Sequence, residues 1–274
     1  MSPTASTQRA RRALFCTVAI AALATTAALA QQQPPQADEQ DLLSDAQVNR
    51  IRQIELSPAD ANSPRPPRIR FDNRAIQRFV DARQELNFRD FNAATDVNKA
   101  LYMIDTAAPG DVLADVQIVT DPGSIDVFKQ QVHGPVLQGC ATSACHGSPD
   151  ASKNGGLRLY NEGRDDRTIY TNFHTLTRAG VDVPNPTGGA FGGPETVRRQ
   201  VIDRQDPDAS LLLSYSLPAD QSPSPHPQVE GLRPMFPNPS NAVFQTMRAW
   251  IATALDPTGG TYGFEGETAA APAQ

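Results

Sequence analysis

Beyond its first thirty residues, the sequence lacks any long apolar run. No later segment approaches the roughly 20 apolar residues that a helix needs to cross a bilayer, so we expect no membrane span in the mature chain. The sequence also lacks a Ser-His-Asp order, a glycine-rich phosphate loop and a paired-carboxylate signature, so no motif indicates a hydrolase or a kinase. Basic side chains are in the minority, with 24 lysines and arginines against 30 acidic residues. This balance disfavours a nucleic acid or an anionic membrane as partner.

The N-terminus has the composition of a secretory signal. Three arginines precede an apolar run at 13–29, and an Ala-Leu-Ala sequence ends at Ala30. We therefore expect 1–30 to be a signal peptide cleaved near Ala30, which sends the mature protein to the periplasm or out of the cell. Cys16 lies inside the apolar run rather than at a lipoprotein cleavage point, so no lipid anchor is expected. Cleavage leaves 21 basic against 30 acidic residues, a formal charge of -9.

The mature chain is predicted to begin with a disordered leader and a small mixed module. Residues 31–40 are rich in glutamine, proline and acids, a composition typical of disorder. Residues 41–122 contain a capping-box pattern at Ser44 and Gln47, followed by short periodic and alternating segments. Helices are expected near 45–56, 73–80 and 97–104, and strands at 68–71 and 116–120. The region is therefore predicted to be a small α+β module, to which we assign no role.

Residues 123–255 are predicted to form an all-α domain with long loops, so the fold class is mainly α. Apolar residues recur at helical spacing in the segment that leads into Cys140, in a segment carrying Phe173, and in the last helix, which carries Trp250. Asp206 followed by proline is expected to open a further short helix. Residues 180–194 and 218–239 are rich in glycine or proline and are predicted to be loops, and 256–274 a flexible tail.

The most informative segment is Gly139-Cys140-Ala141-Thr142-Ser143-Ala144-Cys145-His146-Gly147. Two cysteines with a histidine directly after the second form the pattern of a covalent haem site. The thiols can add to the haem vinyl groups as thioethers, and the histidine can ligate the iron. Four residues separate these cysteines rather than the commoner two, but the Cys145-His146 dipeptide that sets the ligand geometry is unchanged.

Over about 126–255 the chain resembles the c-type cytochromes, with a helix, a Cys-Cys-His site, a loop-rich middle and a closing helix that carries an inward aromatic. In order, the motifs Cys-His-Gly, Gly-Gly-Leu-Arg-Leu, Asp-Pro-x-x-Ser-Leu-Leu, His226-Pro227, Gly-x-Arg-Pro-x-Phe and Ala249-Trp250-Ile251 are similar to those of secreted cytochrome-c-like proteins of planctomycete bacteria.

The resemblance implies a cytochrome-c-like all-α domain with one haem c per chain. Cys140 and Cys145 would be the thioether attachments, His146 the proximal iron ligand and Trp250 a residue packed on the haem. It further implies redox proteins as partners, and the transfer of single electrons rather than enzymatic turnover.

On the other side of the iron, a haem with one histidine has either a second protein ligand or an open position. His226 and Met235 both lie in the loop before the last helix. The resemblance favours His226, with Met235 as the alternative. A second histidine would give a lower potential than methionine. His174 is expected to be a partly buried packing residue, and His133 to be exposed or to line the haem edge.

Three alternatives use the same residues. A haem with five-coordinate iron would make the protein an enzyme or a ligand sensor. A disulfide between Cys140 and Cys145 would suit a haem-free secreted binding module, since thiols outside the cytoplasm are commonly oxidised. A zinc site would need a fourth ligand and reduced thiolates, which that location disfavours.

Overall fold

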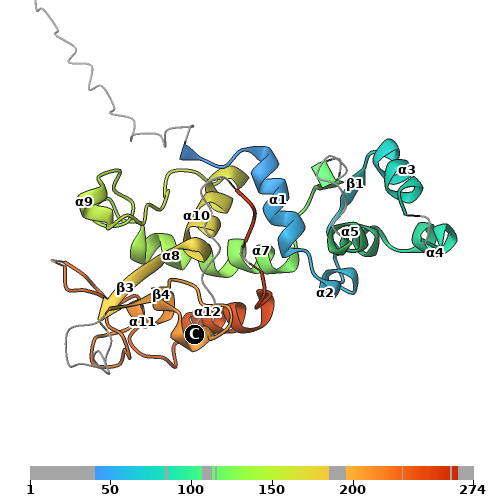
Figure 1. Cartoon of the computed structure of the whole chain (residues 1–274). Coiled ribbons are helices and arrows are strands. Elements are labelled where there is room, and N and C mark those ends of the chain that lie inside the picture. The colour runs from blue at the N-terminus through green and yellow to red at the C-terminus, as the bar shows by residue number, and fades with distance from the viewer. Residues whose placement is uncertain are drawn as a thin grey trace, which may run out of the picture. The chain divides into compact units, whose positions relative to one another are not determined.

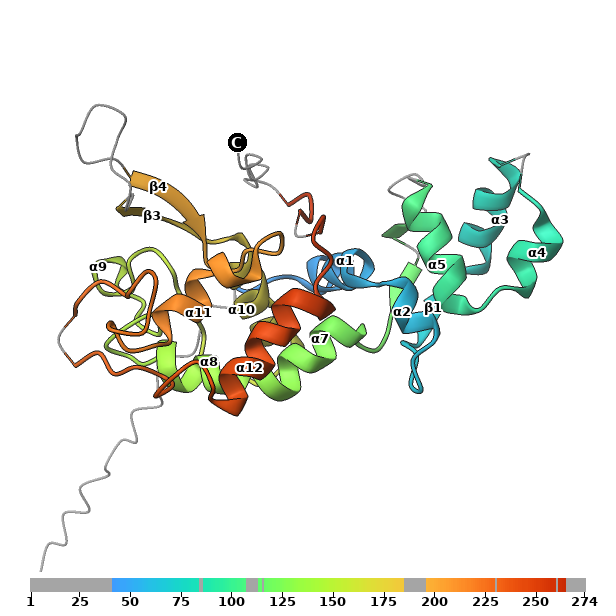
Figure 2. The same ribbon diagram turned by 90° about the horizontal axis from the view of Figure 1, so that it is seen from below.

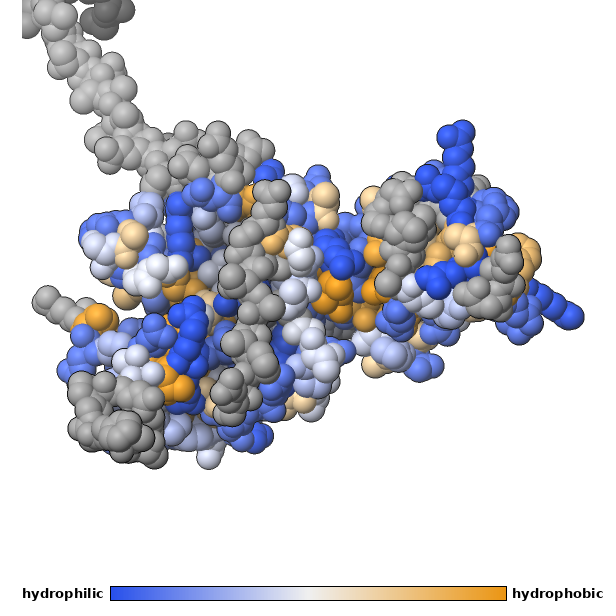
Figure 3. Space-filling view, viewed as in Figure 1, coloured by the Kyte–Doolittle hydropathy of each residue, from blue (hydrophilic) through white to orange (hydrophobic). Residues whose placement is uncertain are grey.

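A computed structural model describes residues 41–83, 86–106, 113–114, 116–184, 196–229, 231–259 and 261–264, all of which belong to one compact unit. The predicted signal peptide and leader lie outside these residues. The described chain is mainly helical with a few short strands (Figure 1), which confirms the mainly-α prediction at that level. None of the described helices combines the length and apolar character needed to cross a membrane. The face seen in Figure 3 is largely hydrophilic, and apolar residues reach it only in small patches.

The elements that the structure describes in the first part of the chain are α1 (Asp45–Glu55), α2 (Pro58–Ala61), β1 (Ile69–Phe71), α3 (Asn73–Asp81), α4 (Phe88–Ala93), α5 (Asp96–Asp105) and β2 (Val116–Ile118). The two strands pair antiparallel, with Ile69 opposite Ile118. The capping box at α1 is formed as predicted, because the Ser44 hydroxyl accepts from the Gln47 amide while the Gln47 side chain accepts from the Ser44 amide. A small core joins these elements: Leu56, Phe79, Phe91, Val97, Ala100, Met103, Val116 and Ile118.

Helix α1 joins this small core to a larger one. Val48 and Ile51 on one face belong to the larger core, which the second half of the chain supplies. Asn49 and Gln53 lie on another face of α1 and form hydrogen bonds with the backbone of β2. The Asn49 side chain donates to the Val116 carbonyl and accepts from the Ile118 amide, both at 2.9 Å, and Gln53 also donates to the Val116 carbonyl. Each of these buried side-chain amides has a backbone hydrogen-bond partner. Helix α1 can therefore contribute to both cores without burying an unpaired amide.

The larger core is built on two antiparallel helical rods. The first runs through α7 (Gly123–Val127), a π-helical segment η2 (Phe128–Val132) and α8 (His133–Cys140). The second runs through α12 (Ala242–Ala249) and a π-helical segment η4 (Trp250–Ala254). Helix α12 contacts η2 while η4 contacts α7, and Figure 2 shows the rods side by side. Their contact positions the end of α8, where Cys140 lies.

Trp250 lies at the centre of the contact between the rods. It is 2% exposed, and its ring lies 5.3 Å from that of Phe128 and 6.3 Å from that of Phe173 in α10 (Asp166–Arg178). Its indole N–H donates to the Ser124 carbonyl at 2.9 Å, which satisfies the one polar atom of a buried tryptophan. The predicted inward aromatic of the last helix is confirmed as a core residue.

The second half of the chain departs from the all-α prediction at one hairpin. Strands β3 (Gly180–Pro184) and β4 (Thr196–Gln200) pair antiparallel, so the expectation of a loop from residue 180 was wrong for its first five residues. Val181 and Val183 alternate with polar neighbours, as a strand requires, but their partners come only after residue 195. Three short helical elements complete the fold: α9 (Ala151–Asn154), a 3₁₀ turn η3 (Pro207–Ala209) and α11 (Leu211–Tyr215). Asp206-Pro207 therefore opens a helical segment as predicted.

A buried ion pair joins α1 to the segment after β4. Arg204 donates to Glu55 at 2.7 Å, and the side chains are 6% and 1% exposed. The Tyr262 hydroxyl donates to Glu55 at 2.8 Å and accepts from Arg204 at 2.9 Å. Tyr262 itself is buried, so this part of the predicted tail is packed against the domain; residues 265–274 lie outside the described chain.

Candidate functional site

The segment from Cys140 to Gly147 forms a tight loop at the C-terminal end of α8. The His146 amide donates to the Cys140 carbonyl at 3.1 Å, and the amides of Cys145 and Gly147 both donate to the Thr142 carbonyl, at 2.9 and 3.0 Å. The four residues between the cysteines are therefore accommodated as a compact turn. This turn brings Cys145 and His146 back beside the end of the helix that carries Cys140.

Both thiols are free, and they differ in surroundings. The Cys140 Sγ lies against the larger core, 3.6 Å from the Met235 Sδ. Burial, with a smaller contribution from the neighbouring Cys145, raises the pKa of the Cys140 thiol to about 11. Cys145 instead lines a cavity of about 440 Å³, together with Met235 and Arg233. Both side chains are partly exposed, but only Cys145 lines the cavity.

His146 is held in one tautomer by the loop that follows it. Its Nδ1 lies 2.8 Å from the Asn154 carbonyl and 3.0 Å from the Leu157 carbonyl. Because carbonyl oxygens can only accept, Nδ1 carries the proton and Nε2 keeps its lone pair. A metal-binding histidine typically has this arrangement, with the second ring nitrogen donating to a backbone carbonyl. The Asn154 side chain in turn donates to the Ser148 carbonyl at 2.9 Å, so the carbonyl at the end of α9 is itself anchored.

His226 faces His146 from a distant part of the chain. The two imidazole centres are 6.2 Å apart, with their planes at 66°. The Nδ1 of His226 lies 2.7 Å from the Pro227 carbonyl, which assigns its proton in the same way. Among the described residues, neither Nε2 has a hydrogen-bond partner. Both rings therefore present an unprotonated Nε2.

The separation of the two rings can be compared with that of two axial ligands. A metal–nitrogen bond is about 2.0–2.1 Å and a ring centre lies about 1.2 Å beyond its nitrogen, so two imidazoles across one metal ion have centres about 6.4 Å apart. The observed 6.2 Å matches this value. The centre-to-centre distance of His146 and His226 is thus compatible with two imidazoles bound to one metal ion.

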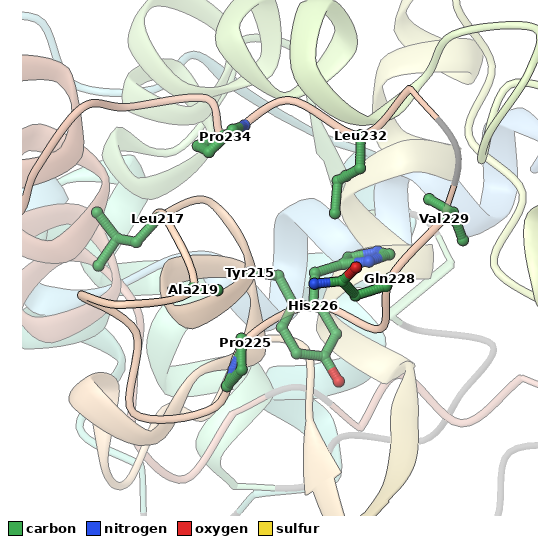
Figure 4. Close-up of a pocket in the computed structure, with 9 residues that line it drawn as sticks. All are labelled: Tyr215, Leu217, Ala219, Pro225, His226, Gln228, Val229, Leu232 and Pro234. Carbon is green, nitrogen blue, oxygen red and sulfur yellow. The ribbon is translucent and has the colours of Figure 1, made fainter.

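Two cavities share Leu232 and Pro234 as walls; His226 lines one of them, and His146 lines neither. One, of about 210 Å³, is lined by His226 and Tyr215 (Figure 4). The other is the 440 Å³ cavity beside Cys145. Large apolar side chains on their walls are unusually exposed: Val229 by 49%, Leu232 by 39% and Val243 by 38%. Exposed apolar groups gathered at one place mark a binding site for an apolar ligand or partner.

Met235 takes a position different from that of His226. Its side chain packs on Gly139, so closely that a Cβ there would lie 2.2 Å from the Met235 Cγ. Its sulfur is next to Cys140 rather than opposite His146. The neighbouring Phe236 amide donates to the Ser216 carbonyl at 3.0 Å and fixes this segment to α11. Met235 therefore packs on Gly139 and contacts Cys140.

The other candidate residues lie away from the cavities. Trp250 lines neither cavity and packs between the helical rods. His174 is half-buried against Tyr262 and Phe264, as predicted for a packing residue.

His133 is buried and 7% exposed, so the expectation of an exposed side chain was wrong, whereas its alternative, a place at the haem edge, stays a prediction. Its Nε2 accepts from the Asn172 side chain at 3.0 Å, and its ring packs on Phe128. Burial, with a contribution from Lys129, lowers the pKa of His133 to about 4.

Sequence reasoning missed Tyr215 and the two carbonyls that hold His146. Tyr215 follows an apolar Leu-Leu-Leu-Ser run, and nothing local distinguishes it from a core residue. The carbonyls have a weak signal in the glycine pair Gly155-Gly156, both with positive φ (61° and 82°), which returns the chain toward His146.

Within the described residues, no group of three or more histidine, cysteine or carboxylate side chains is placed to hold a metal ion. A tetrahedral zinc site would need such a group. No family model, curated protein or solved structure matches this chain.

Proposed function

We propose that this protein is a c-type cytochrome that carries one covalently attached haem and transfers single electrons outside the cytoplasm. Cys140 and Cys145 attach the haem, His146 is the proximal ligand and His226 the distal one. The observation that carries the proposal is the pairing of the two imidazoles at 6.2 Å, each with Nδ1 bound to a carbonyl and Nε2 free. The Cys145-His146 dipeptide beside them supplies the attachment chemistry.

The surroundings fit a large, flat and mostly apolar cofactor. Small-molecule and cofactor sites commonly occupy about 300–1,000 Å³, and the two adjoining cavities of about 210 and 440 Å³ are of this order. The exposed side chains of Val229, Leu232 and Val243 would be covered by such a group. Cys145 and His226 stand on the walls of the two cavities, so one cofactor filling both would reach each of them.

In the proposed function, backbone carbonyls orient the two histidine ligands, and the choice of two histidines lowers the reduction potential. Bound haem would supply an iron centre that gains and loses one electron. The carbonyls of Asn154 and Leu157 orient His146 and increase the basicity of its Nε2. The Pro227 carbonyl does the same for His226. Two histidine ligands favour a lower potential than a histidine and a methionine, and Met235 is engaged with Cys140.

The proposed location and partners follow from the same function. The signal sequence at 1–30 leads to the periplasm or the exterior, where haem is attached to cysteines. The partners would be redox proteins that dock where the haem edge is exposed.

The first test counts haem and thioether bonds. The full chain is produced in a host with haem-attachment machinery and its pyridine haemochrome spectrum is recorded, with a haem peroxidase stain of the denatured protein. We expect one haem that stays bound after denaturation. Cys145→Ala and Cys140→Ala should each leave a single thioether and shift the haemochrome band, and the double variant should abolish the stain. Wild-type protein without covalent haem would overturn the proposal and favour the disulfide-bonded module.

The second test identifies the distal ligand. Wild-type ferrous protein should show a low-spin spectrum and bind carbon monoxide only slowly, because His226 must first leave the iron. His226→Ala should open the position and bind carbon monoxide at once, whereas Met235→Leu and the control His174→Ala should match the wild type. If Met235→Leu opens the iron and His226→Ala does not, the distal assignment is wrong. If the wild-type ferrous iron is high-spin and binds carbon monoxide at once, the five-coordinate enzyme or sensor replaces the electron carrier.

A further inference from the structure

The segment that carries His226 is attached to the end of α11 at three successive residues. The Ser222 hydroxyl donates to the Ser214 carbonyl at 2.7 Å. The Phe236 amide donates to the Ser216 carbonyl at 3.0 Å. Between these two anchor points, the Tyr215 side chain projects toward the segment and contacts His226. The end of α11 therefore supports the segment that carries His226, the proposed distal ligand.

Tyr215 makes the closest aromatic contact of His226. The two ring centres are 4.8 Å apart and the planes meet at 65°, an edge-to-face arrangement. Figure 4 shows both side chains among the residues that line the smaller cavity. Tyr215 is half-buried and follows three buried leucines in α11, so its ring stands on a rigid base.

The backbone on both sides of His226 is also restricted. Pro225 and Pro227 fix their own φ angles, and Pro227 additionally limits the conformations open to His226. The remaining freedom of His226 is the rotation of its side chain. Its Nδ1 contact with Pro227 and its ring contact with Tyr215 limit that rotation from two directions.

We propose that Tyr215 is the positioning residue for the distal ligand: its ring holds the His226 imidazole 6.2 Å from that of His146, ready to ligate before the haem is bound. The inference rests on the proposed function and concerns the ring of Tyr215 rather than its hydroxyl. A preorganised ligand loses less conformational entropy when it binds, so it stays on the iron for a larger fraction of the time.

The test uses the haem-loaded protein and three variants. Tyr215→Leu removes the ring, Tyr215→Phe removes only the hydroxyl, and Tyr102→Leu is the matched control. Tyr102 also makes edge contacts, at 5.9 Å with Phe79 and 6.0 Å with Phe91, but it does so in the small core of the first module. The readouts are the rate of carbon monoxide binding to the ferrous protein, the low-spin absorption bands and the electron paramagnetic resonance g-values of the ferric protein.

Tyr215→Leu should speed carbon monoxide binding about two- to tenfold, the range that corresponds to the loss of one aromatic pair. It should also broaden the g-values, because the His226 ring samples more orientations. Tyr215→Phe and Tyr102→Leu should both match the wild-type protein. A purely structural role would lower stability in Tyr215→Leu without moving the g-values, so thermal unfolding is followed in parallel.

Two results would overturn the inference. If Tyr215→Leu binds carbon monoxide at the wild-type rate, the ring does not position His226. If Tyr215→Phe is as impaired as Tyr215→Leu, the hydroxyl is responsible instead. In both cases a wild-type protein with covalent, low-spin haem would still support the proposed function, whereas absence of covalent haem in the wild type would remove that function itself.

Discussion

Gly147 lies directly against the backbone of Ala141. A Cβ at position 147 would lie 2.2 Å from the Ala141 carbonyl oxygen and 2.9 Å from that of Thr142. Both are backbone atoms, so they can move only if the loop opens. The close approach is what allows the Gly147 amide to donate to the Thr142 carbonyl at 3.0 Å and close the turn around Cys145 and His146.

Gly147→Ala should therefore distort the turn and destabilise the protein by about 1–3 kcal/mol, with a reduced yield of covalent haem. Gly134→Ala is the matched control, because no described atom lies within 4 Å of its added Cβ and alanine favours the surrounding helix. This control should be neutral or stabilising by up to about 1 kcal/mol. Urea denaturation and haem content per chain are the measurements. Equal effects of the two alanines would contradict the close approach.

Arg204→Met should leave the Glu55 carboxylate buried without its cation. Breaking one side of a buried ion pair costs about 3–5 kcal/mol, and the Glu55 side chain is 1% exposed. Arg248→Met is the control, since Arg248 pairs with Asp208 on the surface and both side chains are largely exposed. Its unfolding midpoint should change little, because water screens such a pair. A small effect of Arg204→Met would mean that Glu55 is satisfied without the arginine.

The parts of the structure that follow from local spacing could be predicted from the sequence. The capping box at Ser44 and the apolar repeat that carries Trp250 each depend on residues within a turn or two of one another. The β3 and β4 pairing could not be predicted, since nothing near Val181 indicates that its partner is Arg199, far along the chain. The Glu55 to Arg204 contact spans 149 residues and depends entirely on tertiary packing.

In the candidate site, too, the features that depend on neighbouring residues could be predicted and those that depend on tertiary packing could not. Cys145 and His146 are adjacent, so their shared chemistry is visible in the sequence. The approach of His226 to His146 depends on the support from the end of α11, and sequence order alone could not separate it from the alternative, Met235. The burial of His133 depends on Asn172, which lies 39 residues away on another helix. Helical periodicity at His133 gave no sign of this partner.

His133 should make stability depend on pH. Its pKa is lowered to about 4 in the folded protein against about 6.5 when unfolded, so between these values the unfolded chain binds more protons. The contribution is therefore fully present above about pH 6.5 and is lost as the pH falls toward 4, by about 3 kcal/mol in all. His133→Gln keeps an acceptor for Asn172 but does not titrate. The difference in unfolding free energy between the two proteins, followed from pH 7.5 to 4, should shrink with falling pH; a constant difference would contradict the burial.

Met235 should control access to the Cys140 thiol. In the structure its sulfur is 3.6 Å from the Cys140 Sγ, whereas Cys145 lines the open cavity. In the reduced, haem-free chain, iodoacetamide should therefore alkylate Cys145 faster than Cys140, because a covered thiol with a raised pKa is a poor nucleophile.

Met235→Ala should accelerate the alkylation of Cys140 severalfold and leave that of Cys145 unchanged, while Met235→Leu, which keeps most of the cover, should behave like the wild type. Peptide mass spectrometry over a time course separates the two sites, and far-ultraviolet circular dichroism checks that each variant keeps its helices. Equal rates at both cysteines in folded wild-type protein would show that Met235 does not cover the attachment site.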